Sequence, residues 1–150
     1  MNVYKLTHQR HIEYKLHTGE WITDNKLIGF FDTRDNAEKA KAAISAKPGF
    51  CDFPDDFVIE EYTISEDSLS SVYLVEHSYY IIDDRIDYTA EIGVFPTEDA
   101  AMLAAKEYEK TSKIPVATHS WDEDFDIDNY LSVAKYTVGE ADWQEGFTLS

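Results

Sequence analysis

The chain has 150 residues, which is enough for one ordinary domain or two very small ones. Its hydrophobic content of 43% and aromatic content of 14% can build a core, so global disorder is excluded. The 13 basic and 30 acidic side chains give a net charge of -17, beyond the magnitude of about 2–8 that serves solubility in a small domain. This charge disfavours direct nucleic-acid binding, which needs clustered Lys and Arg, and favours a basic protein partner.

The first half of the chain predicts three strands and one helix. The predicted strands cover 3–8, 26–33 and 57–65. The first alternates two sets of side chains, and the second is a short apolar run rich in strand formers. Thr33 or Asp32 can cap a helix over 34–46, whose small and apolar residues recur at helical spacing. The Pro and Gly of "KPGF" at 47–50 end this helix.

The second half predicts the same plan. Strands are expected at "VYLVEH" (72–77), at the apolar run "EIGVF" (91–95) and at "LSVAKYTVG" (131–139). Thr97 can cap a helix over 98–111, in which Ala and Tyr recur at helical spacing.

Three blocks of the two halves match in the same order, which predicts an internal duplication. "VYKLTH" matches "VYLVEH", "LIGFFDTRDNAEKA" matches "EIGVFPTEDAAMLA", and "EEYTI" matches "AKYTV". The equivalent pairs are Val3/Val72, Tyr4/Tyr73, His8/His77, Ile28/Ile92, Gly29/Gly93, Phe31/Phe95, Ala37/Ala101, Ala40/Ala104 and Tyr62/Tyr136. Gly29 and Gly93 lie within predicted strands, where they indicate a bulge or the close approach of a helix.

The predicted fold class is therefore α+β, with two similar β-β-α-β units. Because a unit of about 65–75 residues is marginally stable alone, we expect the units to pack as a pseudo-symmetric pair, each with an antiparallel sheet and one main helix. The first repeat is predicted at 1–68 and the second, more acidic repeat at 69–150. The polar, Ser-rich stretch 64–71 is the expected junction.

Several of these blocks resemble a family of small, uncharacterised bacterial domains. The family pattern is "VYLxEHSYE", then "IGxYSSxEEA", then "PGFxDxPDGFxIxEY". The chain carries "VYLVEHSYY" at 72–80, "IGFFDTRDNAEKA" at 28–40 and "KPGFCDFPDDFVIEEY" at 47–62, and "DWQEGF" at 142–147 is similar to the family's closing element. The resemblance implies tandem, divergent copies of one domain, and it implies no activity. Small acidic domains of this kind are often associated with immunity or antitoxin partners in bacterial competition loci.

The stretch "SWDEDFDIDNYLS" at 120–132 places five carboxylates in seven positions, which first suggests calcium. An EF-hand loop needs Asp at position 1, Gly at position 6 and Glu at position 12. Counting from Asp122 puts Ile127 at position 6, and counting from Asp124 puts Asn129 there. Both registers also lack the Glu at position 12, so no metal site and no cofactor are predicted.

The catalytic candidates are few. The five histidines include no tight ligand pair, and no GxSxG, P-loop or GxGxxG signature is present. His8 and His77 fall at equivalent strand positions, where we expect each to bond neighbouring backbone, with a catalytic pair as the alternative. Cys51 lies among carboxylates, which disfavour the thiolate. An enzyme is therefore not expected.

The sequence favours a cytoplasmic protein. A single cysteine allows no intrachain disulfide, the N-terminus has no apolar signal region, and no run approaches the roughly 20 apolar residues of a membrane span.

The second half concentrates the negative charge: residues 71–150 carry 17 acidic and five basic side chains, against 13 and eight in residues 1–70. Aromatic rings within an acidic loop are typical of interface anchors with steering charges around them. The predicted partner-binding residues are Trp121, Asp122, Glu123, Asp124, Phe125, Asp126, Asp128 and Tyr130, with Asp83, Asp84 and Asp87 from the loop between the first two strands of the second half. A similar acidic group is Asp52, Asp55 and Asp56 in the first half.

The preferred hypothesis is an immunity or antitoxin protein that occludes a basic bacterial toxin, such as a nuclease, stoichiometrically. The alternatives are a DNA-mimicking inhibitor of a host defence or restriction protein, and a small enzyme that uses His8 or His77. For the aromatic residues of the acidic stretch, packing in the core is the alternative to a place in an interface.

Overall fold

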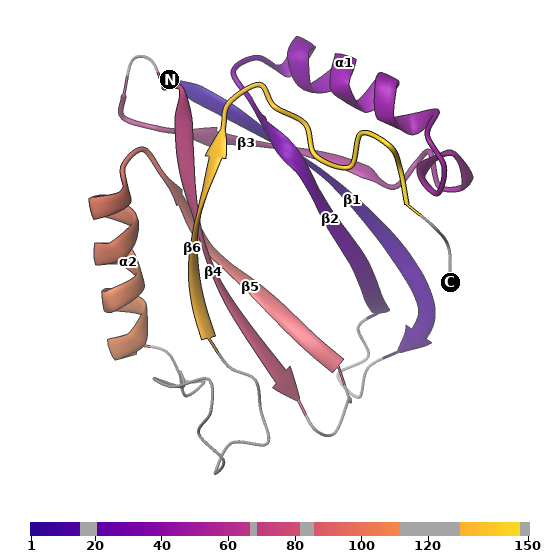
Figure 1. Ribbon diagram of the computed structural model, residues 1–150. Helices are drawn as coiled ribbons and strands as arrows, with labels where there is room; N and C mark the ends of the chain where they lie inside the picture. The colour runs from indigo at the N-terminus through magenta and orange to yellow at the C-terminus, as the bar shows by residue number, and fades with distance from the viewer. Residues whose placement is uncertain (16–20, 67–68, 82–85, 112–129, 148–150) are drawn as a thin grey trace. The chain divides into compact units, whose positions relative to one another are not determined.

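The computed structural model describes residues 1–15, 21–66, 69–81, 86–111 and 130–147. Its elements in chain order are β1 (Asn2–Lys15), β2 (Trp21–Phe31), α1 (Arg34–Ser45), the 3-10 turn η1 (Phe50–Asp52), β3 (Phe57–Thr63), β4 (Ser71–Ile81), β5 (Ile86–Phe95), α2 (Glu98–Thr111) and β6 (Tyr130–Thr137). The fold is α+β, as predicted, with two three-stranded antiparallel sheets and two helices (Figure 1).

The chain divides into two compact units. Unit 1 comprises Met1–Ser70 together with Tyr136–Ser150, and unit 2 comprises Ser71–Lys135. The end of the chain thus belongs to the unit that its beginning forms, whereas the sequence assigned it to the second repeat.

Unit 1 has the strand order β2-β1-β3, and α1 lies along one face of this sheet (Figure 1). Thr33 caps the helix as predicted, since its Oγ1 accepts from the Asn36 N–H at 3.0 Å, a contact that contributes about 1 kcal/mol. The helix buries Ala37 and Ile44 against the sheet. The core beneath it consists of Leu6, Ile28, Phe31, Ala37, Ile44 and Phe50, with Ala141 and Phe147 from the end of the chain packed against it.

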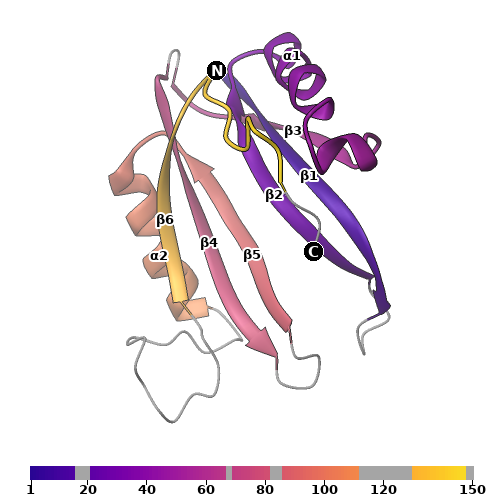
Figure 2. The same cartoon turned by 45° about the vertical axis from the view of Figure 1, so that its right-hand side comes forward.

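Unit 2 has the equivalent strand order, β5-β4-β6, with α2 beside it (Figure 2). The Ala100 N–H donates to Thr97 Oγ1 at 3.1 Å, so this predicted cap is also present. The described core cluster beneath α2 consists of Ala101 and Ala105 from the helix and Val75 from β4, with partly buried neighbours on the strands packed against it.

Both hairpins have the same register and the same one-residue bulge. In unit 1, Leu6 pairs with Gly29 and the next residue of β1 pairs with Leu27, so Ile28 is the extra residue of β2. In unit 2, Val75 pairs with Gly93 and the next residue of β4 pairs with Glu91, so Ile92 is the extra residue of β5. Ile28 and Ile92, and Gly29 and Gly93, are the pairs that the sequence comparison aligned.

The helix bounds agree with the prediction, but the hairpin strands are longer than predicted. β1 continues to Lys15 and β2 begins at Trp21, so the polar segment between the two short predicted strands is mostly strand. Asp87 was expected in a loop, and this is wrong: it is the second residue of β5 and pairs with Tyr80. The reason is that polar residues at every second position are compatible with a strand whose outer face meets water.

Candidate functional site

Most of the predicted partner-binding residues lie outside the residues that the structure describes. These are Trp121, Asp122, Glu123, Asp124, Phe125, Asp126, Asp128, Asp83 and Asp84. Tyr130 begins β6 and Asp87 lies in β5, but their side chains also fall outside the description. The predicted site in the second half therefore stays a prediction, and the candidate that the structure does describe lies in unit 1.

The candidate is built by residues 138–147, the C-terminal segment, which runs beside β2 (Figures 1 and 2). The Gly139 N–H donates to the Phe30 carbonyl at 2.8 Å, and the Asp142 N–H donates to the Ile28 carbonyl at 2.7 Å. These bonds satisfy two of the outer carbonyls of β2, which is the edge strand of its sheet.

Glycines make this close approach of two backbones possible. A Cβ at Gly29 would meet the Glu140 carbonyl oxygen, and a Cβ at Gly146 would meet the Pro48 carbonyl oxygen. The Phe147 N–H donates to that Pro48 carbonyl at 2.9 Å. The sequence predicted a bulge or a close helix approach at Gly29; the bulge is present, but the neighbour is the C-terminal segment rather than a helix.

Phe147 brings the end of the segment into an aromatic cluster around His8, which is fully buried. The His8 ring is edge-on to Phe50 and Phe57, with ring centroids 4.9 and 4.7 Å apart, and its centroid is 6.1 Å from that of Phe147. His8 Nε2 lies 3.0 Å from the Phe53 carbonyl oxygen. Because a carbonyl only accepts, Nε2 carries the proton in this bond.

The backbone bond expected of His8 is thus confirmed. Nδ1 of the same ring is buried and has no hydrogen-bond partner among the described residues. Surrounded by phenylalanine rings and closed to solvent, the imidazole has no described acid or base partner and offers no access to a substrate.

Lys26 is the cross-strand neighbour of His8 and is almost completely buried. Its Nζ lies 4.0 Å from the centroid of the Phe147 ring and 5.4 Å from that of Trp143. Cation–π contacts of this kind are worth about 0.5–2 kcal/mol, depending on how far the cation is desolvated. Lys26 therefore connects the buried aromatic cluster to an aromatic side chain at the surface.

Trp143 is the most unusual residue of the segment. It is the one residue other than glycine, within the described part of the chain, that has a positive φ, at 61°, and its side chain is 42% exposed. A left-handed conformation costs a residue with a Cβ about 1–3 kcal/mol, and glycine or asparagine would serve the turn better. Trp143 is therefore the candidate contact residue of the segment.

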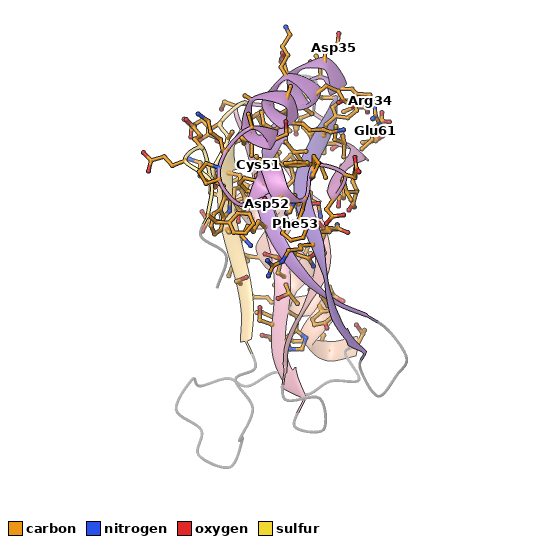
Figure 3. All side chains as sticks on the ribbon, turned by 90° about the vertical axis from the view of Figure 1, so that its right-hand side faces the viewer. Arg34, Asp35, Cys51, Asp52, Phe53 and Glu61 are labelled. Atoms are coloured by element: carbon orange, nitrogen blue, oxygen red, sulfur yellow. The ribbon has the colours of Figure 1, made fainter. Side chains whose placement is uncertain are left out.

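Carboxylates surround this tryptophan in the chain. Glu140, Asp142 and Glu145 are all exposed, and residues 138–147 contain no basic side chain. A further acidic group, formed by Asp52, Asp55 and Asp56 as noted from the sequence, lies around η1, with Asp52 and Asp55 exposed and Asp56 partly buried. Cys51 and Asp52 are labelled beside Phe53 on this turn in Figure 3. We call Trp143 with Glu140, Asp142 and Glu145 the Trp143 surface.

A shallow groove of about 300 Å³ adjoins the segment. Its lining consists of Ala40, Ala43 and Ile44 from α1, Lys47 just after this helix, and Ala141 and Gln144 from the C-terminal segment. The Gln144 side chain donates to the Ala141 carbonyl at 2.7 Å, which braces the turn that carries Trp143. Small apolar walls beside an exposed aromatic ring suit a protein contact.

His77, the counterpart of His8, has a different partner. Its Nδ1 lies 2.7 Å from the Tyr108 hydroxyl of α2, and the two rings are edge-on with centroids 5.3 Å apart. This side-chain bond was not expected from the sequence. Like His8, His77 is fully buried and serves to join a helix or turn to the strand beneath.

Other kinds of site find little support in the described part of the chain. The described residues hold no group of three or more His, Cys, Asp or Glu that could bind a metal ion. Cys51 is exposed rather than packed. Neither of the described helices has the length and apolar character needed to cross a membrane.

Comparisons of the chain with family models, curated proteins and solved structures find no match. The resemblance to a family of bacterial domains therefore stays a prediction, and the site must be interpreted from its own geometry. The described features suit binding to another protein: an exposed aromatic side chain, a groove with mainly apolar walls, and exposed carboxylates close to both in the chain.

The sequence did not single out the Trp143 surface as a site. The motif "DWQEGF" was noted only as a closing element, because its interest depends on a backbone conformation and on a distant strand. The available signal was a tryptophan flanked by carboxylates three residues before a glycine, which resembles the acidic and aromatic pattern at 121–130.

Proposed function

We propose that the protein is an acidic cytoplasmic binding protein that occludes a basic protein partner, as an immunity or antitoxin protein occludes its toxin. The observation that carries the proposal is the exposed, left-handed Trp143 among carboxylates. The ring supplies the anchor, and the charges steer a basic partner and pair with its Lys and Arg. Inhibition is stoichiometric, because each inhibitor molecule covers the functional surface of one partner molecule and catalyses no reaction.

The whole-chain charge supports the same function. A net charge of -17 destabilises the compact chain through self-repulsion, and a basic partner would relieve it. A toxin nuclease presents a groove lined with Lys and Arg for phosphate, which an acidic surface complements. The acidic stretch at 120–132 and the Trp143 surface would then be two acidic, aromatic contact regions on one inhibitor.

The histidine enzyme receives no support from the described residues. His8 and His77 are both fully buried. His8 bonds to the Phe53 carbonyl and His77 to the Tyr108 hydroxyl, and both contacts join elements of the fold. The DNA mimic shares the charge argument and differs in the partner, so the identity of the partner separates it from the immunity protein.

The test is affinity capture from the source cell, with the wild-type chain and Trp143→Ala as parallel baits. Leu103→Ala is the matched control, since Leu103 is also a large exposed apolar side chain but lies on α2. We expect one basic protein that the wild type and the control retain and that Trp143→Ala loses. The purified partner should then lose its activity at one equivalent of inhibitor.

Retention of the same protein by Trp143→Ala with unchanged affinity would remove the anchor from the proposal. An acidic partner, or inhibition at far below one equivalent, would contradict occlusion itself. A partner that is a defence or restriction protein would replace the immunity function by DNA mimicry.

A further inference from the structure

The two units treat the same sheet edge differently. In unit 1 the outer carbonyls of Ile28 and Phe30 accept backbone N–H groups from the C-terminal segment. Since the hairpins share their register and bulge, the counterparts of these residues in unit 2 are Ile92 and Val94, on either side of Gly93. β5 is the edge strand of its sheet, as β2 is of the other.

The counterpart edge is more open. Residues 28–31 are all buried, whereas residues 92–95 are all partly exposed. A Cβ at Gly29 would meet the backbone of another segment, but the atoms nearest to a Cβ at Gly93 would be those of the Phe95 ring, the first of them 2.9 Å away. Among the residues that the structure describes, no backbone therefore lies beside Gly93 as Glu140 lies beside Gly29.

We infer that the outer edge of β5, from Glu91 to Phe95, binds an extended segment of the basic partner as an added strand. The inference rests on the proposed function and adds the mode of recognition. An added strand gains backbone hydrogen bonds along an edge that proteins otherwise protect. Unit 1 provides a precedent for the backbone bonds alone, because two N–H groups of its C-terminal segment bind the corresponding carbonyls, although that segment forms turns rather than a strand.

Charge selects the occupant. Unit 2 contains 14 acidic and five basic side chains. The C-terminal segment is acidic and is already bonded to β2. A second copy of the chain would present the same acidic segment, so like charges oppose its binding. An extended segment with Lys or Arg at alternate positions can pair with the backbone of the β5 edge and also complement the negative charge of unit 2.

A peptide tests the edge without a partner. The probe is residues 138–147 with Glu140→Lys, Asp142→Lys and Glu145→Lys, which keeps the two N–H groups that bind β2 in the chain and reverses the charge of the segment. It is titrated into the full, isotope-labelled chain while the amide signals of Ile92, Gly93 and Val94 are followed. We expect shifts at these residues, and binding about tenfold weaker for the unmodified acidic peptide at low salt.

Two blocking variants and one control make the test specific. Val94→Pro removes the outward N–H, a change that edge strands tolerate, and Val94→Ala is its matched control because it keeps the N–H. Gly93→Ala places a methyl group where the added backbone would lie. We expect Val94→Pro and Gly93→Ala to abolish the shifts and Val94→Ala to retain them. The remaining β4 and β5 signals show whether each variant is folded.

Shifts confined to β2, no shifts at all, or shifts that survive both blocking variants would each overturn the inference. A concentration-dependent dimer that Val94→Pro abolishes would do so too, since the occupant would then be a second copy. The peptide titration does not require the cellular partner, so the two experiments can fail separately. A failed titration would overturn the inference about β5 without affecting the capture result. A failed capture would count against the proposed function without affecting the titration.

Discussion

The carbonyl oxygen of Glu140 lies against Gly29, so close that a methyl group at position 29 would overlap it. The two residues are far apart in the chain. Their approach joins the C-terminal segment to β2, which contributes Ile28 and Phe31 to the core of unit 1. The placement of Trp143 depends on this approach, because the bonds of Gly139 and Asp142 to β2 lie on either side of Glu140.

Gly29→Ala should therefore release the C-terminal segment. We expect a loss of about 1–3 kcal/mol in the free energy of unfolding, because two backbones would have to separate to accept the methyl group. Gly93→Ala is the matched control: its methyl group meets only the Phe95 ring, which can turn away, so its loss should stay below about 1 kcal/mol. Urea unfolding measures both values.

Proteolysis provides a second measurement for the same pair. Cleavage after residue 138 should accelerate in Gly29→Ala and not in Gly93→Ala, since only the first change detaches the segment. Equal stability and equal cleavage of the two variants would mean that the segment does not depend on Gly29.

The conformation of Trp143 predicts a separation of stability from binding. Trp143→Gly should be about 1 kcal/mol more stable than Trp143→Ala, because glycine adopts a φ of 61° without the penalty of a Cβ. Both variants should bind the partner more weakly, and to the same extent, because both lack the ring. If Trp143→Ala were the more stable of the two in urea unfolding, the strain assigned to this residue would be wrong.

His8 should matter for folding and not for activity. In His8→Phe the Phe53 carbonyl loses its donor, while the unpartnered Nδ1 is also removed. These effects oppose each other, so we expect a net loss of about 1 kcal/mol in unfolding free energy. Inhibition of the partner should still reach completion at one equivalent. A folded His8→Phe variant that binds but no longer inhibits would revive a catalytic role for this histidine.

Local signals in the sequence predicted the elements well and the tertiary arrangement only in part. Thr33 and Thr97 marked the helix starts because a cap depends on neighbouring residues. Gly29 and Gly93 marked the bulges for the same reason. The return of the C-terminal segment to β2 depends on long-range backbone pairing, which leaves no periodic pattern in the chain.

The candidate site shows the same limit. Exposed carboxylates could be counted in the sequence, but the positive φ of Trp143 and its contact with Lys26 arise from the packing of Phe147 and Gly146 against a distant turn. The two histidines were recognised as equivalent, but the sequence did not show that Phe53, directly after η1, would bind His8 or that Tyr108 of α2 would bind His77.

The acidic stretch at 120–132 predicts an effect on the rate of association. In one variant, Asp122, Asp124, Asp126 and Asp128 are changed to Asn and Glu123 to Gln. This variant should bind the partner more slowly at low salt, with little change in dissociation, because peripheral charges act mainly on the encounter. The difference from the wild type should shrink as salt rises, since the Debye length is only about 8 Å at physiological ionic strength.

A matched variant separates steering from anchoring. Trp143→Ala should leave the association rate nearly unchanged and raise the dissociation rate, because the ring becomes buried against the partner only after the two proteins have met. Trp121→Ala should behave in the same way if that ring is an interface anchor, and should instead lower the unfolding free energy by about 3–5 kcal/mol if it packs in the core. Stopped-flow binding at two salt concentrations, with melting curves of each variant, distinguishes these results. An association rate that the five neutral substitutions do not change at low salt would leave the stretch as a solvated loop and assign the steering to other carboxylates.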